Sequence, residues 1–191
     1  LIEIAELASE IGAERFVLDD GWFKGRNNAK SSLGDWVVDK KKYPDGLHPL
    51  IDHIHFLKMS FGLWFEPEMV SPDSDLYRLH PDWIMGHKDQ TLGRDQLVLD
   101  ISRKEVENYL FDRISALLTE YPINYIKWDH NRVLPYPDSS QTKSLYSLLS
   151  RIRLEYPAVE IESCSSGGGR IDYGILENTQ RVWLSDSNDA L

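Results

Sequence analysis

The sequence lacks the features that hold a protein in a membrane or stabilise it outside the cell. Its 191 residues include one cysteine, Cys164, so no disulfide can form within the chain. No apolar run in it approaches the roughly 20 residues that a membrane-spanning helix needs. We therefore expect a cytoplasmic protein without a membrane partner.

Basic residues are also in short supply. The chain has 21 Lys and Arg against 31 Asp and Glu, which gives a formal net charge of -10. A surface of this sign repels polyanions, so nucleic acid is excluded as a partner. A neutral or cationic ligand fits the charge better.

Phosphate-binding and metal-binding patterns are missing as well. The run 165–170 (SSGGGR) holds three consecutive glycines, but it lacks the spacing and the terminal Lys-Ser/Thr of a P-loop. Its glycines indicate a loop with positive φ angles or a close approach of the main chain to a ligand. We expect no metal and no cofactor, because none of the six histidines has metal-type spacing with carboxylates: His48, His53, His55, His80, His87 and His130.

Both ends of the sequence interrupt a pattern. Residues 1–8 predict the middle of a helix without an initiator methionine or a capping residue, and Leu191 closely follows a polar strand-end motif. The content of 41% hydrophobic and 11% aromatic residues is typical of a folded domain. We expect residues 1–191 to be part of a single domain that is truncated at both ends. A segment upstream could still carry a signal peptide.

What the sequence does contain is an alternation of short apolar segments and helix-favouring stretches. Such βα units have parallel strands, and they close into a (β/α)8 barrel or build a doubly wound sheet. The barrel is favoured, because polar groups follow every strand and no glycine-rich phosphate turn follows the first. The predicted helices span 1–11, 49–59, 103–121 and 139–156, and the long connections 24–43 and 67–97 suit active-site loops.

Polar side chains follow each of the five predicted strands. Buried polar groups cost free energy unless they are paired or used, so this repeated layout indicates a functional site at the carboxyl ends of the strands. The strands and the residues that follow them are 16–18 with Asp19-Asp20-Gly21-Trp22, 61–65 with Glu66-Pro67-Glu68, 125–128 (which contains Lys127) with Asp129-His130-Asn131, 159–162 with Ser163-Cys164, and 181–184 with Ser185-Asp186.

Asp129 and Asp186 are the candidate catalytic pair. Two carboxylates facing across a site are the minimum equipment for glycoside hydrolysis, with a nucleophile at a separation of about 5–5.5 Å or an activated water at about 6.5–9.5 Å. Lys127 lies two residues before Asp129 and so shares its face of the strand, where it would keep Asp129 ionised. Asp186, beside Trp183, is expected in a drier setting that suits a general acid.

Each of these residues also has a purely structural interpretation. A single Asp at a strand end is commonly a helix cap or part of a surface ion pair, and Asp19-Asp20 could cap a turn. Cys164 alone is best explained as a buried, inert thiol. Tryptophans near strand ends either build the core or stack on the C–H face of a sugar ring: Trp22, Trp36, Trp64, Trp128 and Trp183.

Taken together, these segments resemble the catalytic barrel of family 36 glycoside hydrolases, the retaining α-galactosidases of the bacterial cytoplasmic type. The resemblance extends over essentially the whole chain and implies that residues 16–20 form the second barrel strand, so that the chain supplies strands two to six. The motifs that carry it are FVLDDGW (16–22), GLWFEPEM (62–69), GRDQLVL (93–99), YIKWDHNR (125–132), ESCSSGGGRID (162–172) and WLSDSNDA (183–190).

The resemblance also implies roles for individual residues. Asp129 matches the nucleophile that forms a covalent galactosyl-enzyme, and Asp186 matches the acid/base, with Asp189 as a rival three positions on. Ser166, His130 and the stretch 184–188 depart from the commonest residues of the family, although no carboxylate is lost. Positions that match galactose contacts are Asp19, Asp20, Trp64, Arg94, Lys127, Asn131, Cys164 and Gly168.

The implied activity is hydrolysis of terminal α-linked galactose from oligosaccharides of the raffinose and melibiose type. Two enzymatic alternatives are galactosyl transfer, as in raffinose-synthase-like relatives, and α-N-acetylgalactosaminidase activity. A third alternative, from another class, is a sugar-binding barrel without catalysis. We expect the full-length protein to be a homo-oligomer.

Overall fold

The computed structural model describes residues 1–187. Its main sheet has five parallel strands that lie side by side in chain order. They are β1 (Arg15–Leu18), β2 (Ser60–Phe65), β5 (Tyr125–Trp128), β6 (Glu160–Ser163) and β7 (Arg181–Val182). A second, two-stranded sheet pairs β3 (Met69–Val70) with the antiparallel β4 (Leu97–Val98).

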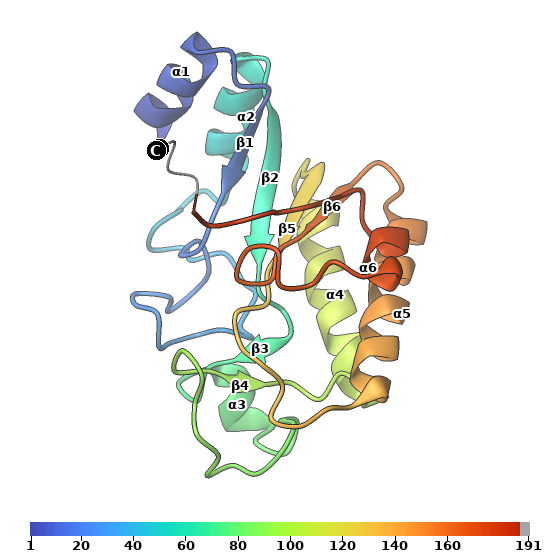
Figure 1. The fold of residues 1–191 in the computed structure, drawn as a ribbon. Coiled ribbons are helices and arrows are strands. Elements are labelled where there is room, and N and C mark those ends of the chain that lie inside the picture. The colour runs from blue at the N-terminus through green and yellow to red at the C-terminus, as the bar shows by residue number, and fades with distance from the viewer. Residues whose placement is uncertain (188–191) are drawn as a thin grey trace.

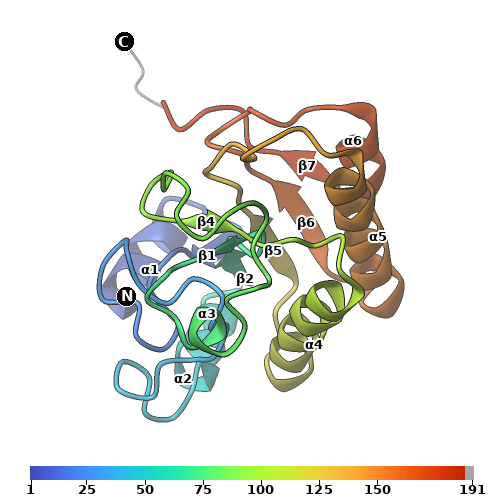
Figure 2. The same ribbon diagram turned by 90° about the horizontal axis from the view of Figure 1, so that it is seen from below.

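Helices connect the strands of the main sheet and pack along it (Figure 1). Helices α4 and α5 lie beside each other next to β5 and β6, while α1 and α2 lie at the other side near β1 and β2, as the view from below also shows (Figure 2). The helices are α1 (Ile2–Glu10), α2 (His48–Phe56), α3 (Asp75–Leu79), α4 (Lys104–Glu120), α5 (Ser139–Glu155) and α6 (Tyr173–Asn178).

This architecture confirms the predicted α/β fold, an arc of a (β/α)8 barrel. Neighbouring strands are parallel and in chain order, as they are around such a barrel. The four predicted helices and five predicted strands are all present, with ends that differ from the predicted ones by a few residues. These five strands correspond to barrel strands two to six in the numbering that the family resemblance implies.

The connection 67–97 contains more structure than the sequence analysis predicted. It holds the β3–β4 pair and the short helix α3, which Ser74 caps by accepting a hydrogen bond from the Tyr77 N–H at 3.0 Å. These elements lie beyond the carboxyl end of β2 (Figure 1). Helix α6 is a second element that the sequence analysis missed, and the Asp172 side chain caps it.

An aromatic cluster supports the carboxyl ends of β1 and β2. The rings of Trp22 and Phe65 lie 5.4 Å apart with an edge-to-face orientation, and those of Phe23 and Trp36 lie 4.8 Å apart. All four side chains are at most 1% exposed. Such pairs stabilise a core beyond the burial of their area, so the core interpretation is the right one for Trp22 and Trp36.

None of the helices within residues 1–187 combines the length and apolar character needed to cross a membrane.

Candidate active site

Asp129 lies directly after β5 and is buried, with 7% of its surface exposed. Its carboxylate accepts hydrogen bonds from Trp64 Nε1 at 3.1 Å and from the main-chain N–H of His130 at 2.9 Å, and a third from Asn131 Nδ2. Hydrogen bonds of this kind fix the orientation of a carboxylate. Asp129 is therefore an oriented carboxylate at the end of a barrel strand.

Asn131 is itself held from two sides. Its main-chain N–H donates to Glu66 Oε1 at 2.8 Å, and its side-chain Oδ1 lies 3.2 Å from Ser166 Oγ. Glu66 follows β2, is 1% exposed, and also accepts a hydrogen bond from Gln96 Nε2 at 3.1 Å. Its burial and then the negative charge of Asp129 raise the pKa of Glu66 to about 7.

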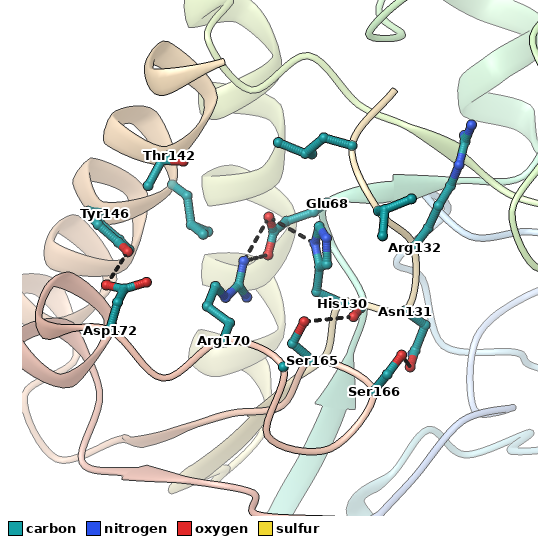
Figure 3. Close-up of a pocket in the computed structure, with 14 residues that line it drawn as sticks. Glu68, His130, Asn131, Arg132, Thr142, Tyr146, Ser165, Ser166, Arg170 and Asp172 are labelled. Carbon is teal, nitrogen blue, oxygen red and sulfur yellow. Dashed lines mark hydrogen bonds and ion pairs between the residues drawn. The ribbon is translucent and has the colours of Figure 1, made fainter. Parts of the chain in front are cut away.

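Glu68 joins three parts of the chain around one buried carboxylate (Figure 3). It is 2% exposed, and it accepts a hydrogen bond from Trp128 Nε1 at 2.9 Å. Arg170 Nη1 lies 2.8 Å from Glu68 Oε1, and His130 Nδ1 lies 3.2 Å from Oε2. Burial alone would raise the pKa of Glu68, but Arg170 and His130 more than offset it and hold the pKa below its usual range.

Lys127 has a different principal partner from the one that the sequence suggested. Its Nζ lies 2.9 Å from Asp19 Oδ2, so Lys127 joins β5 to the residue that follows β1. Burial opposes the charged form of Lys127, but the hydrogen bond and charge of Asp19 raise its pKa above the usual value, with a smaller contribution from Asp129. The charge of Lys127 thus acts on both Asp19 and Asp129, with Asp19 as its direct partner.

Asp20 is oriented by a buried arginine. Arg26, which is 6% exposed, donates from Nε at 2.9 Å to Asp20 Oδ1 and from Nη2 at 2.8 Å to Oδ2. The Asp20 side chain keeps 39% of its surface exposed. A forked pair of this type fixes the plane of the carboxylate, so Asp20 presents defined acceptor oxygens to the solvent side of the site.

Cys164 directly follows β6 and lies beside Asp129. It is 2% exposed, and burial followed by the charge and hydrogen bonding of Asp129 raises its pKa to about 12. The thiol therefore stays protonated and faces Asp129 as a weak donor. This agrees with the interpretation of Cys164 as unreactive.

The glycines of the loop after β6 allow two stretches of main chain to approach each other. A Cβ atom on Gly168 would lie 2.7 Å from the Leu184 carbonyl oxygen. Gly167 has a φ of +86°, and a Cβ there would lie 3.1 Å from Ser185 Cα and 3.2 Å from the Asp186 nitrogen. The predicted positive φ angle is thus present at Gly167, and the close approach is between this loop and the segment that carries Asp186.

In the structure of residues 1–187, Asp186 is exposed to solvent. The expectation of a dry setting for this carboxyl group is therefore wrong. Its Oδ1 accepts a hydrogen bond from Trp183 Nε1 at 3.0 Å, and the Trp183 ring lies 5.0 Å from Lys127 Nζ. Among residues 1–187, the two-residue strand β7 pairs with β6 at one end of the main sheet. Asp189 lies outside the described residues.

Arg94 occupies a tight turn at the rim of the site. It and Asp95 have φ angles of 52° and 60°, and the turn is closed by hydrogen bonds between Gly93 and Gln96. The Arg94 side chain is exposed, and its charge acts on Glu66 to oppose the rise of that pKa.

A cavity of about 500 Å³ lies beside these residues (Figure 3). Its walls come from the loop after β5, the start of α5 and the loop after β6, and they include His130, Tyr146 and Arg170, while Asp129 is not part of them. Residues 1–187 contain no group of three or more His, Cys, Asp or Glu side chains arranged to hold a metal ion.

The structure brings six of the ten predicted site residues into two sets of direct contacts. Asp129 contacts Trp64, Asn131 and Cys164, and Lys127 contacts Asp19. The residues that support these contacts had no role in the sequence-based prediction, although the motif Glu66-Pro67-Glu68 was a visible signal at a strand end. The supporting residues are Arg26, Glu66, Glu68, Gln96 and Arg170.

Comparison with known proteins gives one consistent result. The model of the family described as Melibiase matches residues 1–191. The chain is 50% identical over 200 residues to an α-galactosidase of Escherichia coli, an alignment that covers 100% of this chain and 28% of that protein. It is 44% identical over 206 residues to the α-galactosidase AgaA of Geobacillus stearothermophilus, again with 100% and 28% coverage.

Solved structures agree with these relatives. The galactosidase domain of the α-galactosidase-sucrose kinase AgaSK superposes with a TM-score of 0.93 at 42% identity, covering 98% of this chain and 27% of that one. A variant of the family 36 α-galactosidase AgaA in complex with raffinose gives a TM-score of 0.90 at 41% identity, covering 98% and 28%. The chain thus spans less than a third of the length of the relatives that it matches.

Proposed function

Since the chain belongs to the melibiase family, we propose that it forms part of the single catalytic (β/α)8 barrel of a longer, retaining α-galactosidase. The substrate is a terminal α-linked galactose of an oligosaccharide such as raffinose, the sugar present in the AgaA complex. The observation that carries this proposal is the buried, triply hydrogen-bonded carboxylate of Asp129 at the end of β5.

Asp129 acts as the nucleophile. Its carboxylate oxygen attacks the anomeric carbon of galactose, and the bond from that carbon to the leaving-group oxygen breaks. Trp64, His130 and Asn131 hold the attacking group in place by their N–H donors. Because the carboxylate is oriented before the sugar arrives, little reorganisation is needed in the transition state.

Asp186 acts as the acid/base. It gives its proton to the leaving oxygen in the first step and removes a proton from water in the second, when water displaces Asp129 from the anomeric carbon. Its position on the segment packed against Gly167 keeps it on the same side of the sheet as the loop after β6. Its exposure leaves room for the water of the second step.

The galactose hydroxyls are held by the polar residues around Asp129. Asp20, fixed by Arg26, offers two acceptor oxygens, and the Lys127–Asp19 pair offers a donor and an acceptor. Carboxylates accept well from vicinal hydroxyls. Further contacts come from the rest of the set proposed from the sequence: Trp64, Arg94, Asn131, Cys164 and Gly168.

The location and assembly of the complete protein also remain proposals. The single cysteine favours the reducing cytoplasm, and we propose that the full-length protein is a homo-oligomer.

Hydrolysis of raffinose by the full-length protein and its Asp129→Asn variant tests the proposal. We expect galactose release by the wild type, initial formation of the α-anomer by NMR, and a loss of activity of at least about 1,000-fold in the variant. Release of the β-anomer would contradict retention. Transfer of galactose to added sucrose in preference to water would identify a transferase, and galactose binding without turnover would identify a non-catalytic barrel.

A further inference from the structure

Two glutamates at the end of β2 are buried equally but are compensated differently. Glu66 is 1% exposed and Glu68 is 2% exposed. An isolated buried carboxylate is costly, so each needs an ion partner or a proton. Glu68 has the guanidinium of Arg170 at 2.8 Å and the His130 ring nitrogen Nδ1 at 3.2 Å.

Glu66 is held by neutral groups instead. Among residues 1–187, its hydrogen-bond donors are the Asn131 main-chain N–H at 2.8 Å and Gln96 Nε2 at 3.1 Å. The charged groups that act on it come from two elements: Asp129, which follows β5, and the exposed Arg94, which precedes β4. The stronger of these two charges is the like charge of Asp129, and Arg94 is the weaker influence.

Asp129 is the more extensively hydrogen-bonded of the two neighbouring acids. It accepts three N–H hydrogen bonds, against two for Glu66. Two close carboxyl groups share a proton when like charges face each other, and the proton goes to the group with less support for its charge. The pKa of Glu66, raised to about 7 by burial and by Asp129, is consistent with that distribution.

Gln96 can serve a protonated Glu66. With its amide nitrogen towards Glu66, Gln96 has its Oε1 atom buried and without a donor in the described part of the chain. The oxygen and nitrogen of an amide can be exchanged by rotation about its terminal bond. The reversed amide would present the oxygen to the Glu66 hydroxyl, so a protonated Glu66 supplies the donor that a carboxylate cannot.

We propose that Glu66 is a positioning residue of the Asp129 site that works as a neutral acid. It accepts the Asn131 N–H through one oxygen and donates its own proton to Gln96 through the other, and Asn131 in turn donates to Asp129. The inference rests on the proposed function, because it assigns Glu66 the task of holding the nucleophile without adding a second negative charge.

Replacement of Glu66 in the full-length protein tests the positioning role. Glu66→Leu removes both hydrogen bonds, so Asn131 loses its support and Asp129 its fixed orientation. Misplacement of a reacting group by about 1 Å costs on the order of 100-fold in rate, and we expect kcat for an activated α-galactoside to fall about that much with KM nearly unchanged. Glu66→Gln mimics the neutral acid and should recover most of the loss.

The same variants separate a neutral acid from a carboxylate. If Glu66 works ionised, Glu66→Gln will lose as much activity as Glu66→Leu, and the proposal is overturned. Equal losses in kcat and in galactose affinity for Glu66→Leu would also overturn it, because they indicate general damage rather than misplacement of the nucleophile.

Infrared difference spectroscopy tests the protonation state without any measurement of turnover. We expect a carboxylic-acid C=O band in the wild type just below about pH 7 that fades above it and is missing from Glu66→Gln over the same pH range. If the wild type and Glu66→Gln show the same spectra, the neutral acid is refuted, even if Glu66→Leu does not fold. Should Asp129→Asn retain galactoside hydrolysis, the assignment of Asp129 as nucleophile fails, while the infrared result on Glu66 still stands.

Discussion

Removal of Arg170 should destabilise the protein in a manner that depends on pH. Glu68 is 2% exposed, and Arg170 Nη1 lies 2.8 Å and 3.1 Å from its two oxygens. In Arg170→Met the carboxylate keeps Trp128 and His130 but loses its permanent cation. Loss of one partner of a buried ion pair costs about 3–5 kcal/mol.

Protonation of Glu68 sets an upper limit to that cost. From the ordinary pKa of 4.5 to pH 7, at about 1.36 kcal/mol per unit, protonation costs about 3.4 kcal/mol. We therefore expect Arg170→Met to lower the free energy of unfolding by about 3 kcal/mol at pH 7. In the wild type the pKa of Glu68 is depressed. The stability that ionised Glu68 contributes is therefore complete above pH 4.5 and is lost as the pH falls below that value. The difference between the two proteins should shrink as the pH falls towards 4.5.

Urea denaturation followed by tryptophan fluorescence, at about pH 7 and about pH 5, measures this difference in the full-length protein. The double variant Glu68→Gln/Arg170→Met should be more stable than Arg170→Met, because no buried charge remains. Lys24→Met is the matched control, since the Lys24–Asp75 pair is 65% and 53% exposed and its loss should cost less than about 1 kcal/mol. A cost for Arg170→Met below about 1 kcal/mol at pH 7, or one that does not change with pH, would refute the reasoning.

Three further predictions concern the walls of the site. Arg26→Met frees Asp20 and should raise KM for an α-galactoside about tenfold with a smaller change in kcat, which steady-state kinetics measures; a fall in kcat alone would argue against a binding role. Gly168→Ala should lower the melting temperature by several degrees, because the new Cβ would lie 2.7 Å from the Leu184 oxygen; an unchanged melting temperature would show that the loop does not need a glycine there. Burial and neighbouring charge raise the pKa of the Cys164 thiol to about 12, so it should resist iodoacetamide in the folded protein and react after denaturation. Mass spectrometry measures both reactions, and rapid reaction in the folded state would contradict a buried, protonated thiol.

The main sheet was predictable because its signals are local. Each strand is a short apolar run followed by polar residues, and each helix has its own period of apolar positions. The β3–β4 pair was not predictable in this way, since Met69 pairs with Val98 across a connection that contains its own helix. Pairing over such a separation depends on tertiary contacts, which a periodic pattern does not carry.

The same contrast between local signals and long-range contacts applies to the residues of the candidate site. Asp129 was predictable because a carboxylate at the end of a buried strand has few structural uses. The partner of Lys127 was not, because Asp19 is 108 positions away in the sequence, and only the placement of β1 and β5 on either side of β2 brings it within 2.9 Å.

The central claim is that Asp129 is the nucleophile of a retaining α-galactosidase. The direct measurement is incubation of the full-length protein with an activated fluorinated α-galactoside, followed by peptide mass spectrometry to locate the covalently bound sugar. The account predicts a label on Asp129 and none in Asp129→Asn. A label on another acid, or turnover of the reagent without a covalent adduct, would contradict it.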